Sequence, residues 1–121
     1  MTTTQSTHRV DVTPGTEHVV VVIDGVVVAD STRPLLVHET GLPVRYYLPR
    51  EDVRLDQFRA SRTTTTCPYK GEASYWTFVD DQGNQCRDVV WSYQEPLESV
   101  AAIADHFSFY DTVADVRVTA G

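Results

Sequence analysis

Cysteine and basic residues are both scarce in this 121-residue chain, and each scarcity excludes a class of protein. The 2 cysteines, Cys67 and Cys86, are far apart and form no Cys-x-x-Cys motif, so neither a zinc site nor any other metal site is predicted. Only 10 lysines and arginines oppose 17 acidic residues, which gives a formal net charge of −7. Because nucleic-acid binding depends on clustered basic side chains, no nucleic-acid partner is expected.

The chain also lacks a long apolar run. Its most apolar stretch, residues 19–29, is interrupted by Asp24-Gly25 and is too short to cross a bilayer as a helix. Residues 1–7 have no apolar core that could act as a signal peptide, and their small polar side chains predict a disordered leader. Together with the few cysteines, these features predict a cytoplasmic protein with no membrane partner.

Strand patterns dominate residues 8–121, which are expected to form one domain because a chain of this length can bury only one core. Two β-branched runs, 19–23 and 26–29, flank Asp24-Gly25. Asp-Gly supplies the two positive φ angles of a type I′ turn, so a tight hairpin is predicted.

A second hairpin is predicted from 72–79 and 85–93, which are joined by turn-forming residues. The segment from Pro49 to Asp52 is predicted as a loop or a single helical turn, and one helix is expected from Leu97 to Ala104, after Pro96. Further strands are expected at 35–39, 44–48, 63–66 and 113–119. The sequence therefore predicts a mainly β protein with one C-terminal helix.

Amphipathic rings surround a thiol and an ammonium group between Thr66 and Trp76, and more rings follow at 91–93. Such rings bury large apolar bodies while their hydroxyl or indole groups stay available, which suits a pocket for an organic ligand. Strand alternation places Ala73, Tyr75 and Thr77 on one face, opposite Trp76 and Phe78, and puts Trp91 on the same face as Tyr93.

Each candidate residue has a structural alternative. Lys70, which precedes Gly71, could present its ammonium group to an anionic ligand, or it could be a solvated turn lysine. Cys67 could be a nucleophile, but a lone cysteine before proline is more often a small buried hydrophobic residue. The histidines are dispersed, and each is most simply a surface or edge residue: His8, His18, His38 and His106.

The large aromatic residues cannot all contact a ligand, because a small two-sheet fold needs many of its rings for the core. About half of them are expected to be core residues. Tyr46 shares a face with Val44 and Leu48, which predicts that it is the buried residue of the Tyr46-Tyr47 pair. Tyr47 would then lie beside Arg45 on a more polar face, as the better candidate for a ligand contact.

The chain resembles the family called domain of unknown function 427. The residues that carry this resemblance are Thr32-Arg33, Glu39-Thr40-Gly41, Pro43, Tyr46-Tyr47, Pro49 to Val53, Thr66 to Gly71, Ala73, Tyr75-Trp76, Trp91-Ser92-Tyr93 and Phe109-Tyr110. The resemblance implies a β-tent-like arrangement of two antiparallel sheets, with an aromatic-lined cavity between them and a short helical turn besides the C-terminal helix. Some classifications give this family a nucleotidyltransferase label.

The resemblance also places Arg33, Glu39 and Arg50 at family motif positions, where they could form structural ion pairs or contact a ligand. It favours the ligand-binding interpretation of Lys70. The full set of candidate ligand-binding residues is Arg33, Glu39, Tyr47, Arg50, Cys67, Lys70, Tyr75, Trp91, Tyr93 and Tyr110.

Three functions remain open. The favoured one is a small-molecule-binding module without a cofactor, whose ligand is a small polar organic molecule that could carry an anionic group. The second is an enzyme of the nucleotidyltransferase type, although no paired carboxylates for magnesium and no triphosphate-binding loop are evident. The third is a protein interaction module that uses exposed sheet edges. A monomer or a weak homodimer is expected.

Overall fold

The computed structural model describes residues 8–121, so the leader predicted at 1–7 lies outside the described residues. The described chain forms two antiparallel sheets, as expected from the family resemblance. The larger sheet contains, in spatial order, β1 (Val10–Pro14), β4 (Leu35–Glu39), β5 (Arg45–Pro49), β9 (His106–Phe109), β8 (Gln85–Ser92), β7 (Gly71–Val79) and β6 (Phe58–Cys67). The smaller sheet contains β10 (Asp115–Thr119), β2 (His18–Ile23) and β3 (Val26–Ser31).

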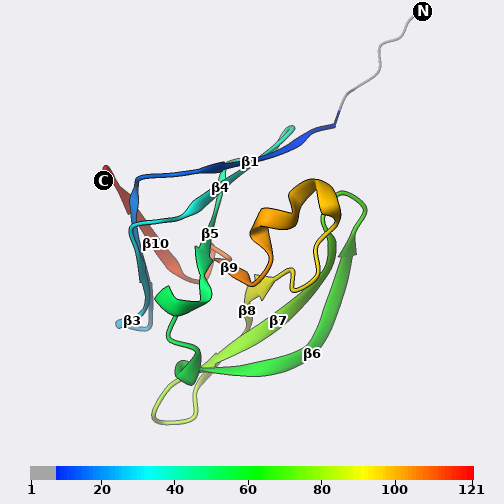
Figure 1. The fold of residues 1–121 in the computed structure, drawn as a ribbon. Coiled ribbons are helices and arrows are strands. Elements are labelled where there is room, and N and C mark those ends of the chain that lie inside the picture. Colours follow the sequence, from blue (N-terminus) through cyan, green and yellow to red (C-terminus); the bar gives the residue numbers. More distant parts are fainter. Residues whose placement is uncertain (1–7) are drawn as a thin grey trace, which may run out of the picture.

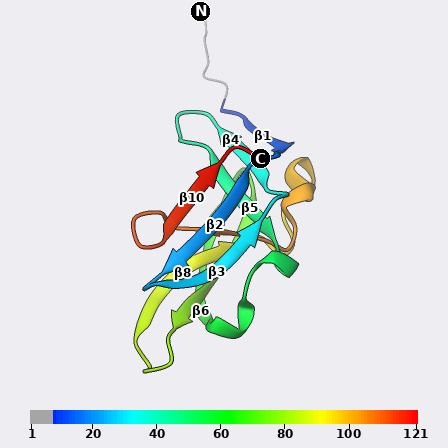
Figure 2. The same ribbon diagram turned by 90° about the vertical axis from the view of Figure 1, so that its left-hand side faces the viewer.

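Figure 1 shows that the larger sheet is strongly bent: β1 and β4 run across one end, while β6 and β7 run along the other. The smaller sheet covers one side of this bent sheet, and Figure 2 shows β10, β2 and β3 lying in front of β8. A short 3-10 helix, η3 (Glu98–Ile103), lies inside the bend on the opposite side (Figure 1).

Both predicted hairpins are confirmed. Strands β2 and β3 pair in an antiparallel manner around Asp24 and Gly25, whose φ values of 50° and 80° are the two positive angles of the predicted turn. Strands β7 and β8 also pair, with a register shift between Trp76 and Phe78. The strands expected near 35–39, 44–48, 63–66 and 113–119 correspond to β4, β5, part of β6 and β10.

The predicted helix from Leu97 to Ala104 is wrong in type. The segment forms η3, a 3-10 helix whose course is broken at Val100, where φ is −127° and ψ is 29°. A segment this short cannot offset the cost of α-helix nucleation by itself. Val100 and Ile103 are the buried residues of this broken segment, and both belong to the apolar core. The helical turn predicted at Pro49–Asp52 is confirmed as the 3-10 helix η1 (Arg50–Asp52), and a further one, η2 (Leu55–Gln57), follows.

Strand β9 was not predicted because it is only four residues long, and a run as short as His106 to Phe109, although it alternates polar and apolar residues, is weak evidence for a strand. The alternation would also have misplaced Ser108, which is buried because β9 lies in the middle of the larger sheet. Strand β1, also unpredicted, lies at the edge of the sheet and pairs only with β4.

The larger sheet has an apolar core on each face. The interlayer core, between the two sheets, contains Val19, Val21, Ile23, Val28, Ala29, Leu48, Val53, Phe78, Val89, Val90, Phe107, Phe109 and Ala114. The aromatic core, inside the bend, contains Val37, Tyr47, Ala73, Tyr75, Trp91, Tyr93, Val100 and Ile103. Trp76 packs against the interlayer core, which confirms the predicted assignment of hairpin faces.

The prediction for Tyr46 and Tyr47 is reversed. Tyr47 is 1% exposed and belongs to the aromatic core, whereas Tyr46 is only half-buried and packs against the interlayer core. Alternation does separate the two rings onto opposite faces. It fails to say which face is buried, because β5 is an interior strand with a core on either side.

Candidate functional site

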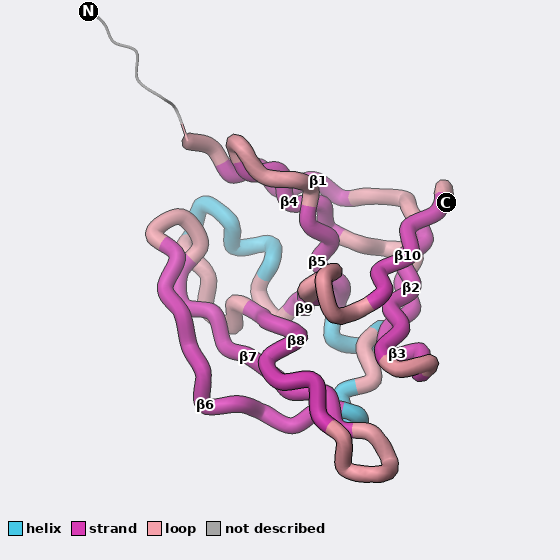
Figure 3. Tube along the Cα trace, turned by 180° about the vertical axis from the view of Figure 1, so that it is seen from behind, coloured by secondary structure: helices cyan, strands magenta, loops and turns pink. Residues whose placement is uncertain are grey.

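A cavity of about 190 Å³ opens from the aromatic core. Residues of strands β4 and β5 and of their loop line one wall, residues of β7 and β8 line another, and Lys70 of the β6–β7 turn lines one end. Figure 3 shows how these strands are arranged around the bend. The residues that line it are Val37, Glu39, Leu42, Pro43, Arg45, Tyr47, Lys70, Tyr75, Trp91, Tyr93 and Tyr110. The family resemblance implied an aromatic cavity between two sheets. The aromatic cavity instead lies within the bend of the larger sheet, on the face away from the smaller one.

The two aromatic walls are held together by one polar contact. The indole Nε1 of Trp91 donates a hydrogen bond of 3.0 Å to the hydroxyl of Tyr47, and the two rings meet edge to face with their centroids 6.3 Å apart. Tyr110 packs on the other side of Trp91, at a centroid distance of 4.5 Å, and stacks against Tyr75. Four rings from three parts of the chain therefore form one rigid surface.

Lys70 is buried at the end of this cavity and is not a solvated turn lysine. The residue is 8% exposed, its Nζ donates to Oε1 of Glu39, and the ammonium group lies 5.9 Å from the centre of the Tyr93 ring. The other oxygen of Glu39 bonds Nε2 of His8 at 2.9 Å. Two hydrogen-bonding partners on one carboxylate fix its position, and the carboxylate in turn fixes the ammonium group.

The backbone at Gly71 explains why Lys70 is directed inward. Gly71 has a φ of 112°, and a Cβ there would meet backbone atoms of residues 95–97 at 3.5 Å. The carbonyl of Lys70 accepts a hydrogen bond of 2.9 Å from the amide of Leu97. The positive φ is what favours glycine here, because a Cβ at 3.5 Å would make only an ordinary van der Waals contact. The hydrogen bond anchors the turn against the segment that leads into η3.

The ionisation of Glu39 is set by opposing effects. Burial acts to raise the pKa of this carboxyl, but hydrogen bonds from Lys70 and His8, together with their charges, outweigh it and lower the pKa below 4.5. Glu39 is therefore a carboxylate at neutral pH.

Three tyrosine hydroxyls of the cavity are held in the neutral form. Burial raises the pKa of Tyr47 to about 12, with the nearby charge of Glu39 contributing. Burial likewise raises the pKa of Tyr93, and burial together with a hydrogen bond to Tyr75 raises the pKa of Tyr110 to about 12. These groups remain hydroxyls, and hence hydrogen-bond donors, far above neutral pH.

A spectrophotometric titration should reveal these hydroxyls. We expect Tyr47 and Tyr110 to ionise near pH 12 in the folded protein, and Tyr93 to ionise later than an ordinary tyrosine, whereas all 6 tyrosines should ionise near pH 10 in denaturant. Because the folded pKa values are raised, the stability linked to them is fully present below pH 10 and is lost as the pH rises from 10 towards 12 and above. Tyr47→Phe should remove one late-ionising group, and an unchanged late amplitude in that variant would contradict the assignment.

The model of the family described as domain of unknown function (DUF427) matches residues 11–120. The chain belongs to this family. No curated protein matches the chain. The description of this family assigns no function to the DUF427 domain.

The structure brings most of the predicted site residues of this DUF427 domain together and leaves three apart. Glu39, Tyr47, Lys70, Tyr75, Trp91, Tyr93 and Tyr110 line the aromatic cavity. Cys67 is half-buried and packs against the aromatic core without lining the cavity.

Arg33 and Arg50 form ion pairs elsewhere. Arg33 contacts Asp52 at 3.2 Å and Glu51 at 3.3 Å on the surface. Arg50 donates two hydrogen bonds, of 2.8 and 2.7 Å, to the carboxylate of Asp105. Hydrogen bonding by Arg50 lowers the pKa of that carboxyl. Arg33 and Arg50 therefore have the geometry of structural ion pairs, which was the alternative to a ligand contact.

Two polar residues of the DUF427 site were missed by sequence reasoning. Arg45 lines the cavity with its guanidinium carbon 5.5 Å from the centre of a Trp91 ring, and it pairs with Asp111 at 3.6 Å. Arg45 stands two residues before Tyr47, so strand alternation places both side chains on the same face, and this could have identified Arg45 as a site residue. His8 was predicted to be a surface or edge residue, but it contacts Glu39 and stacks on Tyr69 with ring centroids 4.0 Å apart. No local pattern announces a contact between residues 31 positions apart.

Two further observations concern only residues 8–121. No group of three histidine, cysteine or acidic side chains converges there in a way that could hold a metal ion. No helix in the same part of the chain is long and apolar enough to span a membrane.

Proposed function

We propose that this domain binds a small polar organic molecule, with a flat apolar body and an anionic group, in the aromatic cavity. The observation that carries the proposal is the buried ammonium group of Lys70 at the end of a cavity whose walls are aromatic rings. A buried charge is costly unless the protein uses it or pairs it. Here it is paired with Glu39, yet it remains part of the cavity lining.

The charge of the lining favours an anion. Lys70 and Arg45 contribute two positive charges, and Glu39 contributes one negative charge, so the lining carries a formal charge of +1. The raised pKa values of the cavity tyrosines keep their hydroxyls protonated, and these hydroxyls can donate to acceptor oxygens. A monoanionic ligand with further acceptor oxygens complements this arrangement.

The volume limits the ligand to a small molecule. Drug-sized ligands occupy pockets of roughly 300–1,000 Å³, whereas this cavity measures about 190 Å³. A small aromatic or cyclic carboxylate fits that volume better than an entire nucleoside triphosphate. The flat walls, in which Tyr110 lies 4.5 Å from Trp91 and parallel to Tyr75 within 8°, favour a planar ring.

The nucleotidyltransferase alternative has less support than the ligand-binding function. Such chemistry uses converging carboxylates to hold magnesium ions and a basic cradle for the triphosphate. The carboxylate that lines the aromatic cavity, Glu39, is already paired with Lys70 and His8. The β-tent arrangement, a cytoplasmic location and a monomeric or weakly dimeric state belong to the same proposal. The location is supported by Cys67 and Cys86, which form no disulfide with each other.

The proposal is tested by a fluorescence titration with small ring carboxylates such as benzoate and 4-hydroxybenzoate, read from Trp91 in a Trp76→Phe background. A carboxylate that binds should lose about 1–3 kcal/mol of binding free energy in the Lys70→Met variant, the range for a charge-assisted hydrogen bond. The matched control is Arg117→Gln, which removes an exposed cation of β10 that pairs with Asp115 away from the cavity.

Equal weakening by Lys70→Met and Arg117→Gln would mean that only the overall charge matters, and this would contradict the proposed site. Steady magnesium-dependent release of pyrophosphate from a nucleoside triphosphate by the purified protein would instead support the enzyme alternative.

A further inference from the structure

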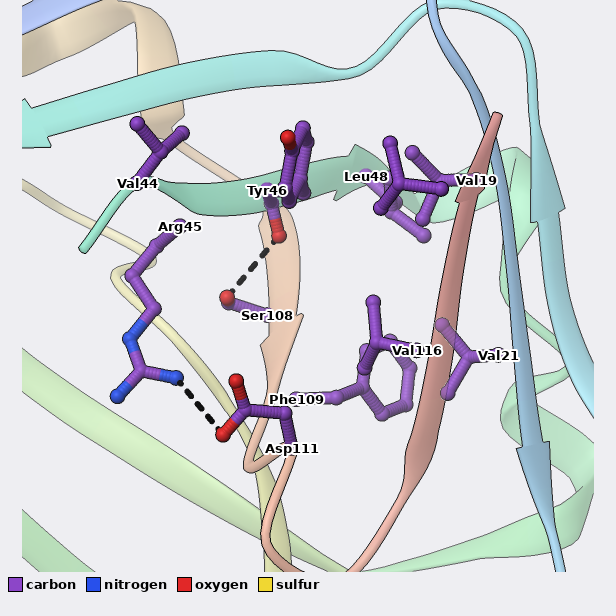
Figure 4. A pocket seen from close by; sticks show the side chains of 11 residues that line it. Val19, Val21, Val44, Arg45, Tyr46, Leu48, Ser108, Phe109, Asp111 and Val116 are labelled. Carbon is purple, nitrogen blue, oxygen red and sulfur yellow. Dashed lines mark hydrogen bonds and ion pairs between the residues drawn. The ribbon is translucent and has the colours of Figure 1, made fainter. Parts of the chain in front are cut away.

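A second cavity, of about 230 Å³, lies between the two sheets and is separate from the aromatic one (Figure 4). Strands β2 and β10 of the smaller sheet form one side of it, and β5 and β9 of the larger sheet form the other. Figure 4 shows the side chains of Val19, Val21, Val116, Leu48 and Phe109 gathered at one end. All of these side chains are apolar.

The other end of the interlayer cavity is charged. Arg45 extends away from β5 toward Asp111, and their closest nitrogen and oxygen atoms are 3.6 Å apart (Figure 4). The hydroxyl of Ser108 already donates to the carbonyl of Tyr46 at 3.0 Å. The polar groups of the lining that remain for an occupant are the hydroxyl of Tyr46 and the two charged partners, and only a charged partner can bind an ionised group by charge.

Of these two partners, Arg45 is the fixed one. Its side chain is 34% exposed and its guanidinium group lies over the Trp91 ring, whereas the side chain of Asp111 is 64% exposed. Their separation of 3.6 Å exceeds the usual length of a hydrogen bond. An exposed pair of this kind contributes little to stability, so another carboxylate can take the place of Asp111 at small cost.

We propose that the interlayer cavity binds a short linear aliphatic carboxylate. The hydrocarbon tail lies among the valines between the sheets, and the carboxylate accepts hydrogen bonds from Arg45 in place of Asp111. A volume of 230 Å³ corresponds to on the order of eight water-sized groups, which suits a chain of about six to eight carbon atoms. Arg45 lines both cavities, but the site of the tail between the sheets is separate from the aromatic cavity, where Lys70 carries the proposal, so either proposal can fail without the other.

The experiment titrates the protein with octanoate and follows valine methyl resonances by NMR. Octanoate should shift the methyl signals of Val21 and Val116, which line the interlayer cavity, and should leave Val37, which lines only the aromatic one, unchanged. Hexanoate, which is two methylenes shorter, should bind about fifteenfold more weakly, because each methylene that is removed from water tightens binding by about fourfold. Octylamine should bind more weakly than octanoate.

Three variants locate the charged end. Arg45→Gln should weaken octanoate by about tenfold or more, since a charge-assisted contact is lost. Asp111→Asn removes the competing carboxylate from an exposed position and should tighten octanoate by up to about fivefold. Arg117→Gln, an arginine on β10 that lies outside the cavity lining, should leave the affinity for octanoate unchanged.

Several results would overturn the proposal. They are the absence of methyl shifts at millimolar octanoate, shifts at Val37 instead of Val21, and equal affinity for octanoate, octanol and octylamine. If Arg45→Gln does not fold, the Asp111→Asn variant still decides the matter, and unchanged or weaker octanoate binding in that variant refutes the role of Arg45.

Discussion

Trp91→Ala should lower the free energy of unfolding by about 3–5 kcal/mol, the usual cost of truncating a buried tryptophan. Trp91 is 7% exposed, donates to the hydroxyl of Tyr47 and contacts Tyr110. Its removal opens a hole between the two walls of the aromatic cavity and leaves the Tyr47 hydroxyl without its donor. Urea unfolding followed by far-ultraviolet circular dichroism measures the loss.

The same substitution should abolish binding of any ligand of the aromatic cavity. Trp76→Ala is the matched control, because it also removes a tryptophan from the hairpin formed by β7 and β8 but from the opposite face, where Trp76 packs on Phe107 at 5.0 Å. That variant should be destabilised and should still bind the ligand. Loss of binding in both variants, at temperatures where both are folded, would show that the effect is one of general stability.

Glu39→Leu should destabilise the protein by about 3 kcal/mol, the lower end of the range for breaking a buried ion pair. The substitution leaves the ammonium group of Lys70 without a counter-charge, although that side chain is only 10% exposed. Adding Lys70→Met should recover most of the loss, since the double variant has no unpaired charge in the cavity and fills it with apolar groups. A double-mutant cycle by chemical unfolding measures the coupling between the two residues.

Acidification provides an independent check on the same pair. The pKa of Glu39 is lower in the folded protein than its ordinary value of 4.5, so its contribution to stability is present above that pH and is lost as the pH falls below it. Glu39→Gln should flatten this acid-dependent decline. Additive single-variant effects together with an unchanged acid profile would show that the pair contributes nothing.

Much of the fold follows from local sequence patterns. The Asp24-Gly25 turn between two β-branched runs determines a hairpin because few other residue pairs adopt two positive φ angles. Alternation along β7 and β8 correctly separates Trp76 and Phe78 from Tyr75 and Trp91. Each of these predictions depends on residues within a few positions of one another.

Two failures share a cause. The burial of Tyr47 could not be predicted, because the middle of the larger sheet has a core on both faces and alternation along β5 does not mark one side as exposed. The helix at 97–104 was predicted from its apolar spacing, yet packing of Val100 and Ile103 against the aromatic core selects a 3-10 form. Tertiary contacts overrode local preference in both cases.

The candidate site divides in the same way. By itself the sequence determined which side chains the site draws on, since the rings and the ammonium group were evident as a cluster of residue types. Only the tertiary structure decided that Lys70 is buried against Glu39, that Arg45 lies between two cavities, and that the aromatic cavity lies within the bend of one sheet. The physical reason is that burial and charge pairing join residues far apart in the chain, and the free energy of such contacts depends on their three-dimensional surroundings rather than on their neighbours in sequence.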